Sequence, residues 1–189
     1  MELMPDFALH RPTTPEDAVR LRTETDGALY VAGGTDMLVN VRRGIEQPKA
    51  LIDLSGIDEL TRIAEDGDGL HIGAGITLDV IARDARIARD FTAIADAAAA
   101  VAGPTHQNYG TLGGNLCLDT RCLFYNQSEW WRKSNDYCLK ERGDICHVAP
   151  GGTQCFAAFS GDVAPAALVH RAEIDLIGRS GRRRVPLSQ

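Results

Sequence analysis

Apolar and polar positions alternate along this chain in short blocks that predict small strands and helices. Residues 28–32 (ALYVA) and 50–54 (ALIDL) are compact apolar runs, which predicts a short buried strand and a second strand after it. Between them, Thr35 is expected to cap a helix from about Asp36 to Arg43, and Gly44 is expected to end it. This order has the spacing of a small βαβ-type unit.

The mixed pattern continues toward the C-terminal end. Residues 61–74 predict a hairpin that turns at 66–69, and residues 173–178 and 182–187 predict another hairpin. Thr77 is expected to cap a short helix. Apolar residues at helical spacing from Phe91 to Val101 predict a further helix, which Gly103-Pro104 ends. The pattern indicates an α+β chain built as two α/β lobes.

Composition excludes several classes of function. The chain has 189 residues, 44% hydrophobic and 24% charged, as is ordinary for a globular protein. Its net charge of −6 argues against nucleic acid as the main partner, and the basic run 182–184 is expected to be a solvated strand end. No apolar run approaches the ~20 residues of a membrane span. The first residues, MELMPDFALHRP, lack the features of a secretion signal, so we expect a cytoplasmic protein with no membrane partner.

Two loops contain a Gly-Gly pair next to polar residues: VAGGTD at 31–36 and TLGGN at 111–115. Backbone N–H groups of such loops can approach an anion closely, and a following helix adds partial positive charge. Tight turns explain Gly-Gly pairs as well. Neither loop matches GxGxxG or the P-loop pattern, so a Rossmann fold or nucleotide hydrolase is not indicated.

The cysteines are the second chemical signal. Cys122, Cys138, Cys146 and Cys155 are spaced C-x15-C-x7-C-x8-C, and Cys117 precedes them. In a reducing compartment such clustering favours a metal or redox site over disulfides. The spacing matches neither a ferredoxin nor a paired zinc knuckle, and four thiolates suit iron–sulfur or zinc better than harder metals. Cys117 is expected to be a small buried residue, and His147 a surface or hydrogen-bonding histidine.

Five stretches together resemble a known family: VAGGTD (31–36), IDLSGIDEL (52–60), HIGAGITLDVI (71–81), TLGGNLC (111–117) and SGDVAPAALV (160–169). They are similar to the FAD-binding subunits of the molybdenum hydroxylases, the xanthine oxidase family, whose flavin domain has the PCMH-type fold. The resemblance implies two lobes, residues 1–55 and 56–189, with the family's further C-terminal subdomain absent.

The resemblance also implies which residues hold FAD. The pyrophosphate would be held by Leu29, Tyr30, Val31, Ala32, Gly33, Gly34, Thr35 and Asp36. The flavin side would be closed by Thr111, Leu112, Gly113, Gly114 and Asn115. Val101 would pack near the flavin, and Asp162 would bond the sugar of the cofactor.

About forty residues separate GGNLC from the stretch that contains Asp162. This insert, at about 118–158, resembles that of the β subunits of 4-hydroxybenzoyl-CoA reductases, which hold a [4Fe-4S] cluster. The resemblance implies Cys122, Cys138, Cys146 and Cys155 as its ligands. Trp130 and Trp131 are expected to shield the cluster and to pack the insert, which would otherwise be a long loop without a core.

The function implied by this resemblance is electron transfer. Reduced ferredoxin would supply electrons to the [4Fe-4S] cluster and then FAD. A small subunit with [2Fe-2S] clusters and a large molybdopterin-containing subunit would follow, in a hetero-oligomer that converts 4-hydroxybenzoyl-CoA to benzoyl-CoA. No residue of this chain is assigned to substrate chemistry. Two alternatives stay open: the FAD subunit of another molybdenum hydroxylase, of xanthine, aldehyde or CO dehydrogenase type, and a zinc-stabilised binding module without enzymatic function.

Overall fold

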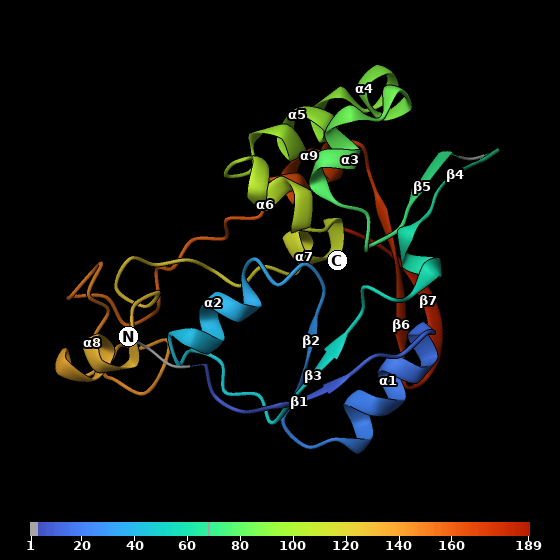
Figure 1. The fold of residues 1–189 in the computed structure, drawn as a ribbon. Coiled ribbons are helices and arrows are strands. Elements are labelled where there is room, and N and C mark those ends of the chain that lie inside the picture. Colours follow the sequence, from blue (N-terminus) through green and yellow to red (C-terminus); the bar gives the residue numbers. More distant parts are fainter. Residues whose placement is uncertain (1–3, 68) are drawn as a thin grey trace. The chain divides into compact units, whose positions relative to one another are not determined.

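The computed structural model describes residues 4–67 and 69–189, and these residues pack into two compact units (Figure 1). The first, here called the core unit, comprises residues 7–35, 48–117 and 161–189. The second, here called the cysteine unit, comprises residues 4–6, 36–47 and 118–160. Both units draw on segments that are far apart in the sequence. The predicted division into lobes at residue 55 stays a prediction.

A small parallel sheet forms one part of the core unit. Its strand order is β1 (Ala8–His10), β3 (Ala50–Asp53), β2 (Ala28–Val31). Helix α1 (Pro15–Glu24) connects β1 to β2, and the Thr14 hydroxyl caps it by accepting a hydrogen bond from the Asp17 N–H at 3.2 Å. The cluster of buried side chains beneath this sheet consists of Ala18, Ala28, Ala50, Ile52 and Ile57. Both predicted strands are thus confirmed, but the burial expected for β2 holds only for Ala28 and Val31, since Tyr30 is 37% exposed.

Short helices form the other part of the core unit, gathered around one cluster of aliphatic side chains (Figure 1). They are α3 (Leu78–Arg83), α4 (Ala85–Asp90), α5 (Thr92–Ala100), α6 (Pro104–Tyr109), α7 (Leu112–Leu116) and α9 (Val163–Val169). Ile81, Ile87 and Val163 are fully buried there. Ile76 and Leu78 belong to the same cluster as Val163 and Ala167. The second Gly-Gly loop therefore lies near Asp162, and its Asn115 accepts a hydrogen bond from the Val163 N–H.

Two antiparallel hairpins complete the core unit. Strand β4 (Ile63–Asp66) pairs with β5 (Gly69–Ile72), and β6 (Glu173–Gly178) pairs with β7 (Gly181–Pro186). A 3-10 turn, η1 (Asp58–Thr61), precedes the first hairpin. Both hairpins are where the alternating pattern predicted them. The basic run lies on β7 and is exposed as expected, with Arg182 paired to Glu16 and Glu59.

The cysteine unit contains helix α2 (Met37–Arg42) and helix α8 (Glu129–Ser134). An isolated bridge joins Arg121 to Ala158, so the two ends of the insert lie together. The Ser128 hydroxyl caps α8 by accepting from the Trp131 N–H at 3.2 Å. The insert therefore has ordered structure, with one capped helix of its own, where the sequence indicated only a long loop. None of the helices in residues 4–67 and 69–189 has the length and apolar character needed to cross a bilayer.

Two local predictions were wrong and a third is confirmed in position. Thr77 is the N-cap residue of α3 as predicted, although its hydroxyl makes no cap hydrogen bond. Asp36, not Thr35, is the N-cap residue of α2, and its side chain makes no cap hydrogen bond. Residues 112–116 form the short helix α7 despite two glycines, because Thr111 caps it and tertiary hydrogen bonds hold it.

Candidate cofactor sites

The first Gly-Gly loop follows β2 and packs directly on the end of α6. A Cβ atom on Gly33 would lie 1.7 Å from the Tyr109 carbonyl oxygen, so no larger residue fits there. Gly34 has φ +72°, the left-handed region that glycine adopts without strain. Among the described residues, the N–H groups of Gly33, Gly34 and Thr35 donate no hydrogen bond. A strand-end loop with unpaired amides fits an anionic group such as a pyrophosphate.

The second Gly-Gly loop differs, because its amides are already used. The N–H of Leu112 donates to Ile76 at 2.9 Å and that of Gly113 donates to Ala74 at 2.8 Å. The N–H of Gly114 donates to the Thr111 hydroxyl at 3.1 Å. A Cβ on Gly113 would meet the Ala74 side chain at 2.9 Å. This loop therefore offers a cofactor its shape and close packing, whereas the first offers hydrogen-bond donors.

Asn115 connects the second loop to the last helix. Its side chain is 5% exposed, and its Oδ1 accepts a hydrogen bond from the Val163 N–H at 3.0 Å. Asp162, at the N-cap of α9, is exposed, and its carboxylate makes no cap hydrogen bond with its helix. That carboxylate is thus available to a hydroxyl of a sugar, while Asn115 has a structural role.

For the other residues expected at FAD, the structure shows their position. Leu29, Tyr30 and Val31 lie within the ladder of β2, so their backbone groups pair with β3. Val101 packs against the aliphatic cluster, and its carbonyl accepts from the Gln107 side chain at 3.0 Å. Asp36 belongs to the cysteine unit, where its carboxylate pairs with Arg121. Their predicted roles at FAD stay predictions.

The four cysteines predicted as metal ligands line one cavity of the cysteine unit. Cys122, Cys138, Cys146 and Cys155 all contribute to its wall, together with Phe124, Tyr125, Leu139, Lys140, His147 and Ala157. The cavity has an empty volume of about 270 Å³, part of which is open to solvent. Within the described residues, no three His, Cys, Asp or Glu side chains form a group that could hold a single metal ion.

Backbone N–H groups lie close to two of the sulfur atoms in this cavity. The nearby N–H groups of Ala149, Phe156 and Val148 lower the pKa of the Cys146 thiol, although burial opposes this. This favours the thiolate of Cys146, and thiolate is the form that binds metals. The N–H of Ala157 donates to the Cys155 sulfur at 3.4 Å.

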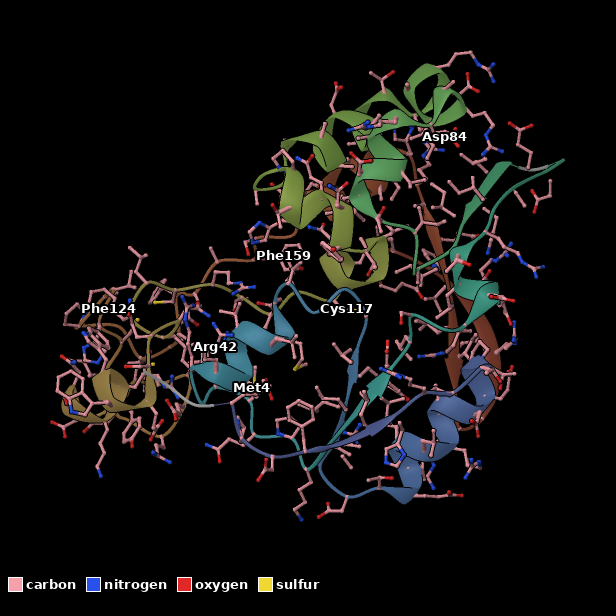
Figure 2. The ribbon with its side chains drawn as sticks, viewed as in Figure 1. Met4, Arg42, Asp84, Cys117, Phe124 and Phe159 are labelled. Atoms are coloured by element: carbon pink, nitrogen blue, oxygen red, sulfur yellow. The ribbon has the colours of Figure 1, made fainter. Side chains whose placement is uncertain are left out.

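Aromatic residues stand beside the cavity. Phe124, labelled in Figure 2, lies 6.1 Å from Trp131 and 5.5 Å from His147 between ring centroids. The His147 Nε2 is 2.6 Å from the Tyr137 carbonyl oxygen, so this histidine is hydrogen-bonded, as expected. Trp131 packs on Phe124 within the insert, and its predicted shielding role stays a prediction. Trp130 is 75% exposed, so it does not pack as predicted.

Cys117 was expected to be buried, and that was wrong. It follows α7 as the C-cap residue, belongs to the core unit and is exposed. It is not among the residues that line the cysteine cavity. Its separation from the other cysteines makes it a natural control for them.

The burial of two cationic side chains of the insert was not predicted from the sequence. Arg132 is 2% exposed and donates to Glu129 at 2.8 Å and Glu141 at 3.0 Å, as well as to backbone carbonyls of residues 43, 44 and 127. Lys140 lies in the wall of the cysteine cavity with its side chain 15% exposed. The available signal was weak: basic residues alternate with aromatic ones from Tyr125 to Arg142, which is equally typical of a surface.

Comparison with known proteins decides what kind of domain this is. Residues 5–189 match the family described as the FAD binding domain in molybdopterin dehydrogenase. The chain belongs to this family. FAD is accordingly the cofactor of its fold, which agrees with the unpaired amides of the first Gly-Gly loop. A carbon monoxide dehydrogenase of Hydrogenophaga pseudoflava, solved without the Mo-pyranopterin moiety of its cofactor, covers 98% of this chain with a TM-score of 0.72 and 25% identity.

Among curated relatives, the alignments differ in how much of the chain they include. The aldehyde oxidoreductase FAD-binding subunit PaoB of Escherichia coli K12 is 31% identical over 186 residues, 96% of this chain. The xanthine dehydrogenase FAD-binding subunit of E. coli O157:H7 is 37% identical over 115 residues, 59% of this chain. Coverage of 96% necessarily includes the cysteine segment. The chain spans about half the length of these relatives, 58% of the first and 39% of the second.

Proposed function

We propose that this chain is the electron-transferring flavin subunit of a molybdenum hydroxylase-type oxidoreductase, and that it holds a [4Fe-4S] cluster in addition to FAD. The observation that carries the proposal is the cavity lined by Cys122, Cys138, Cys146 and Cys155. These four cysteines come from different parts of a 43-residue segment, 118–160, yet all four line one cavity. Four thiolates around a cavity, rather than around one point, suit a polynuclear centre better than a zinc ion, whose sulfur ligands lie roughly 3.8 Å apart.

The residues present fit such a cluster chemically. Backbone N–H groups act on Cys146 and Cys155, as they do on the sulfurs of many iron–sulfur sites. Phe124 and Tyr125 line the same cavity and limit the access of water. A [4Fe-4S] cluster supplies one-electron chemistry when bound. This chain would hold it, exclude solvent and adjust the stability of its reduced form.

For FAD, we propose that residues 32–35 bind the pyrophosphate through backbone amides and that Asp162 binds a sugar hydroxyl. Thr111 and Asn115 would act indirectly, by fixing the second loop and α9 in place. FAD exchanges electrons singly or in pairs and can therefore connect one-electron and two-electron donors. The protein contributes position and electrostatics, and no acid–base residue of this chain is needed for the substrate.

For the whole enzyme, we propose a 4-hydroxybenzoyl-CoA reductase. This chain would be its β subunit and would act in a hetero-oligomer with a molybdopterin-containing large subunit and a [2Fe-2S] small subunit, with ferredoxin as donor. The cysteine insert supports this proposal because an added one-electron centre has a use where a one-electron donor feeds the flavin. It has less use in an enzyme that delivers electron pairs to NAD.

A second candidate is the FAD subunit of an aldehyde oxidoreductase. The specific observation in its favour is the alignment with PaoB, which runs through the cysteine segment, whereas that with the xanthine dehydrogenase subunit covers 59% of the chain. Under this proposal electrons would flow from the molybdenum centre toward this subunit.

Activity of the complete enzyme separates the two candidates. The chain would be produced with its partner subunits under anoxic conditions and supplied either with 4-hydroxybenzoyl-CoA and reduced ferredoxin, or with benzaldehyde and an oxidised acceptor dye. We expect benzoyl-CoA from the first reaction. Rapid aldehyde oxidation with no benzoyl-CoA would support the second candidate instead.

Flavin binding is tested separately on the same preparation. Gly34→Ala places a side chain at φ +72° in the first loop, and it should lower flavin content severalfold. Gly151→Ala is the matched control, since a Cβ there meets no atom within 4 Å. Equal flavin contents in the two variants would contradict the assignment of this loop.

A further inference from the structure

Lys140 is the one side chain with a fixed positive charge among the described residues that line the cysteine cavity. Its ammonium group lies 2.7 Å from the Asp119 carboxylate and 2.8 Å from the Thr120 carbonyl oxygen, and it also donates to the Thr120 hydroxyl. It stands 4.9 Å from the centre of the Tyr125 ring. Hydrogen bonds, an ion pair and a cation–π contact thus fix this charge in the cavity wall.

The charge of Lys140 is only partly compensated on the side of the cavity. Its side chain is 15% exposed, whereas that of Asp119 is 69% exposed. Asp119 remains a carboxylate: burial alone would raise its pKa, but hydrogen bonds from Lys140 and Thr120 lower the pKa overall. Water screens the exposed carboxylate more strongly than the buried ammonium. A positive charge held by hydrogen bonds therefore lies in the wall of the cavity.

We propose that Lys140 sets the reduction potential of the centre held by the four cysteines. This inference rests on the proposed [4Fe-4S] cluster. Reduction adds one electron and no atom to the cluster, so it increases the negative charge in the cavity. A fixed cation in a wall of low polarity stabilises the reduced state and raises the potential. Lys140 would act on the cluster through the electric field of its charge and would not coordinate iron.

The test compares three variants of the full chain, purified without oxygen and titrated with dithionite while the reduced cluster is followed by low-temperature EPR. Lys140→Met keeps the length of the side chain and removes its charge. Lys140→Arg keeps the charge. Lys133→Met is the matched control, because it removes one exposed positive charge from α8, at a residue that does not line the cavity.

We expect Lys140→Met to lower the reduced-to-oxidised ratio at a fixed potential at least tenfold, which for one electron corresponds to 59 mV. Lys140→Arg and Lys133→Met should stay near wild type. An unchanged potential in Lys140→Met with full iron and sulfide content would overturn this inference and leave the proposed function intact. A wild-type chain without iron and sulfide would overturn both.

A second variant keeps the inference testable if Lys140→Met fails to retain its cluster. Asp119→Asn leaves every lining residue of the cavity in place and removes the negative partner of Lys140. At low ionic strength it should shift the potential upward, in the direction opposite to Lys140→Met. A downward shift, or none, would contradict the role of this charge pair.

Discussion

The core unit buries two clusters of aliphatic side chains, whereas the cysteine unit buries a network of polar groups. Ile81, Ile87 and Ile52 have no exposed surface, and every member of both clusters belongs to the core unit. In the described part of the cysteine unit, the buried apolar side chains are Val41 and Cys146, and the largest buried one is Arg132. The core unit is held together by removal of apolar area from water, and the cysteine unit by hydrogen bonds and ion pairs.

This difference indicates what the four cysteines of the insert could contribute to folding. A segment of 43 residues, 118–160, with little apolar burial cannot offset the conformational entropy lost on folding unless something else contributes. A bound metal centre is such a contribution, because its ligands are held only in the folded state. Cofactor loss should therefore affect the two units unequally.

The largest expected effect comes from Cys138→Ser. It removes one of the four proposed ligands, so the iron content should fall from about four per chain to well below one. Hydrogen exchange should then lose protection in residues 118–160 while α3 and α5 stay protected. Cys117→Ser, which changes a cysteine outside the cavity, should keep its iron. Unaltered protection of the insert in the iron-free variant would break the comparison between the units.

Arg132→Met should be next in size. The substitution removes the donor to Glu129, to Glu141 and to the carbonyls of residues 43, 44 and 127, and each buried acceptor left without a donor costs about 1–3 kcal/mol. Exchange protection of α8 and of residues 43–44 should report the loss. Arg142→Met removes a side chain that is 58% exposed and should change protection little. Similar effects of the two variants would argue against a buried arginine network.

Ile81→Ala addresses the core unit. Ile81 is fully buried, and such truncations cost about 2–5 kcal/mol. Thermal or denaturant unfolding should show this destabilisation, with the iron content unchanged. The neighbouring Val80 is 45% exposed and gives the matched control Val80→Ala, for which little change is expected. Iron loss in Ile81→Ala would show that the units are not independent.

The smallest expected effect concerns Asp84, which is labelled in Figure 2 and caps α4 through the N–H groups of residues 86 and 87. Its hydrogen bonds with Arg86 lower its pKa from 3.8 to about 2. Because the folded pKa is the lower one, this stabilisation is present above about pH 4 and is lost as the pH falls through about 2. Asp84→Ala should cost about 1 kcal/mol at neutral pH. Chemical denaturation should show that this difference in the free energy of unfolding becomes smaller as the pH is lowered. The control Asp96→Asn, on the exposed face of α5, should have the same free energy of unfolding as wild type.

Sequence patterns predicted the core unit better than the cysteine unit, for a physical reason. Alternating and helical periodicity report burial against an apolar core, so the two hairpins, strands β2 and β3, and α5 could be found. Helix α7 contains two glycines and depends on hydrogen bonds to Ala74 and Ile76, which no local pattern encodes.

The burial of Arg132 likewise depends on carbonyls of residues 43 and 44, nearly ninety positions away. The four cysteines were predicted as ligands through a resemblance, because their spacing alone left zinc and iron–sulfur open, and their role as ligands stays a prediction. Lys140 had only the weak signal of basic residues among aromatic ones, because its proposed role arises from the cavity that it lines.

The most direct test of the account is a determination of iron, acid-labile sulfide and zinc in the anaerobically purified chain, with EPR after dithionite reduction. The account predicts about four irons and four sulfides per chain and the signal of a reduced [4Fe-4S] cluster. One zinc ion per chain with neither iron nor sulfide would contradict it, and the cysteine unit would then be a structural insert on a flavin-binding fold.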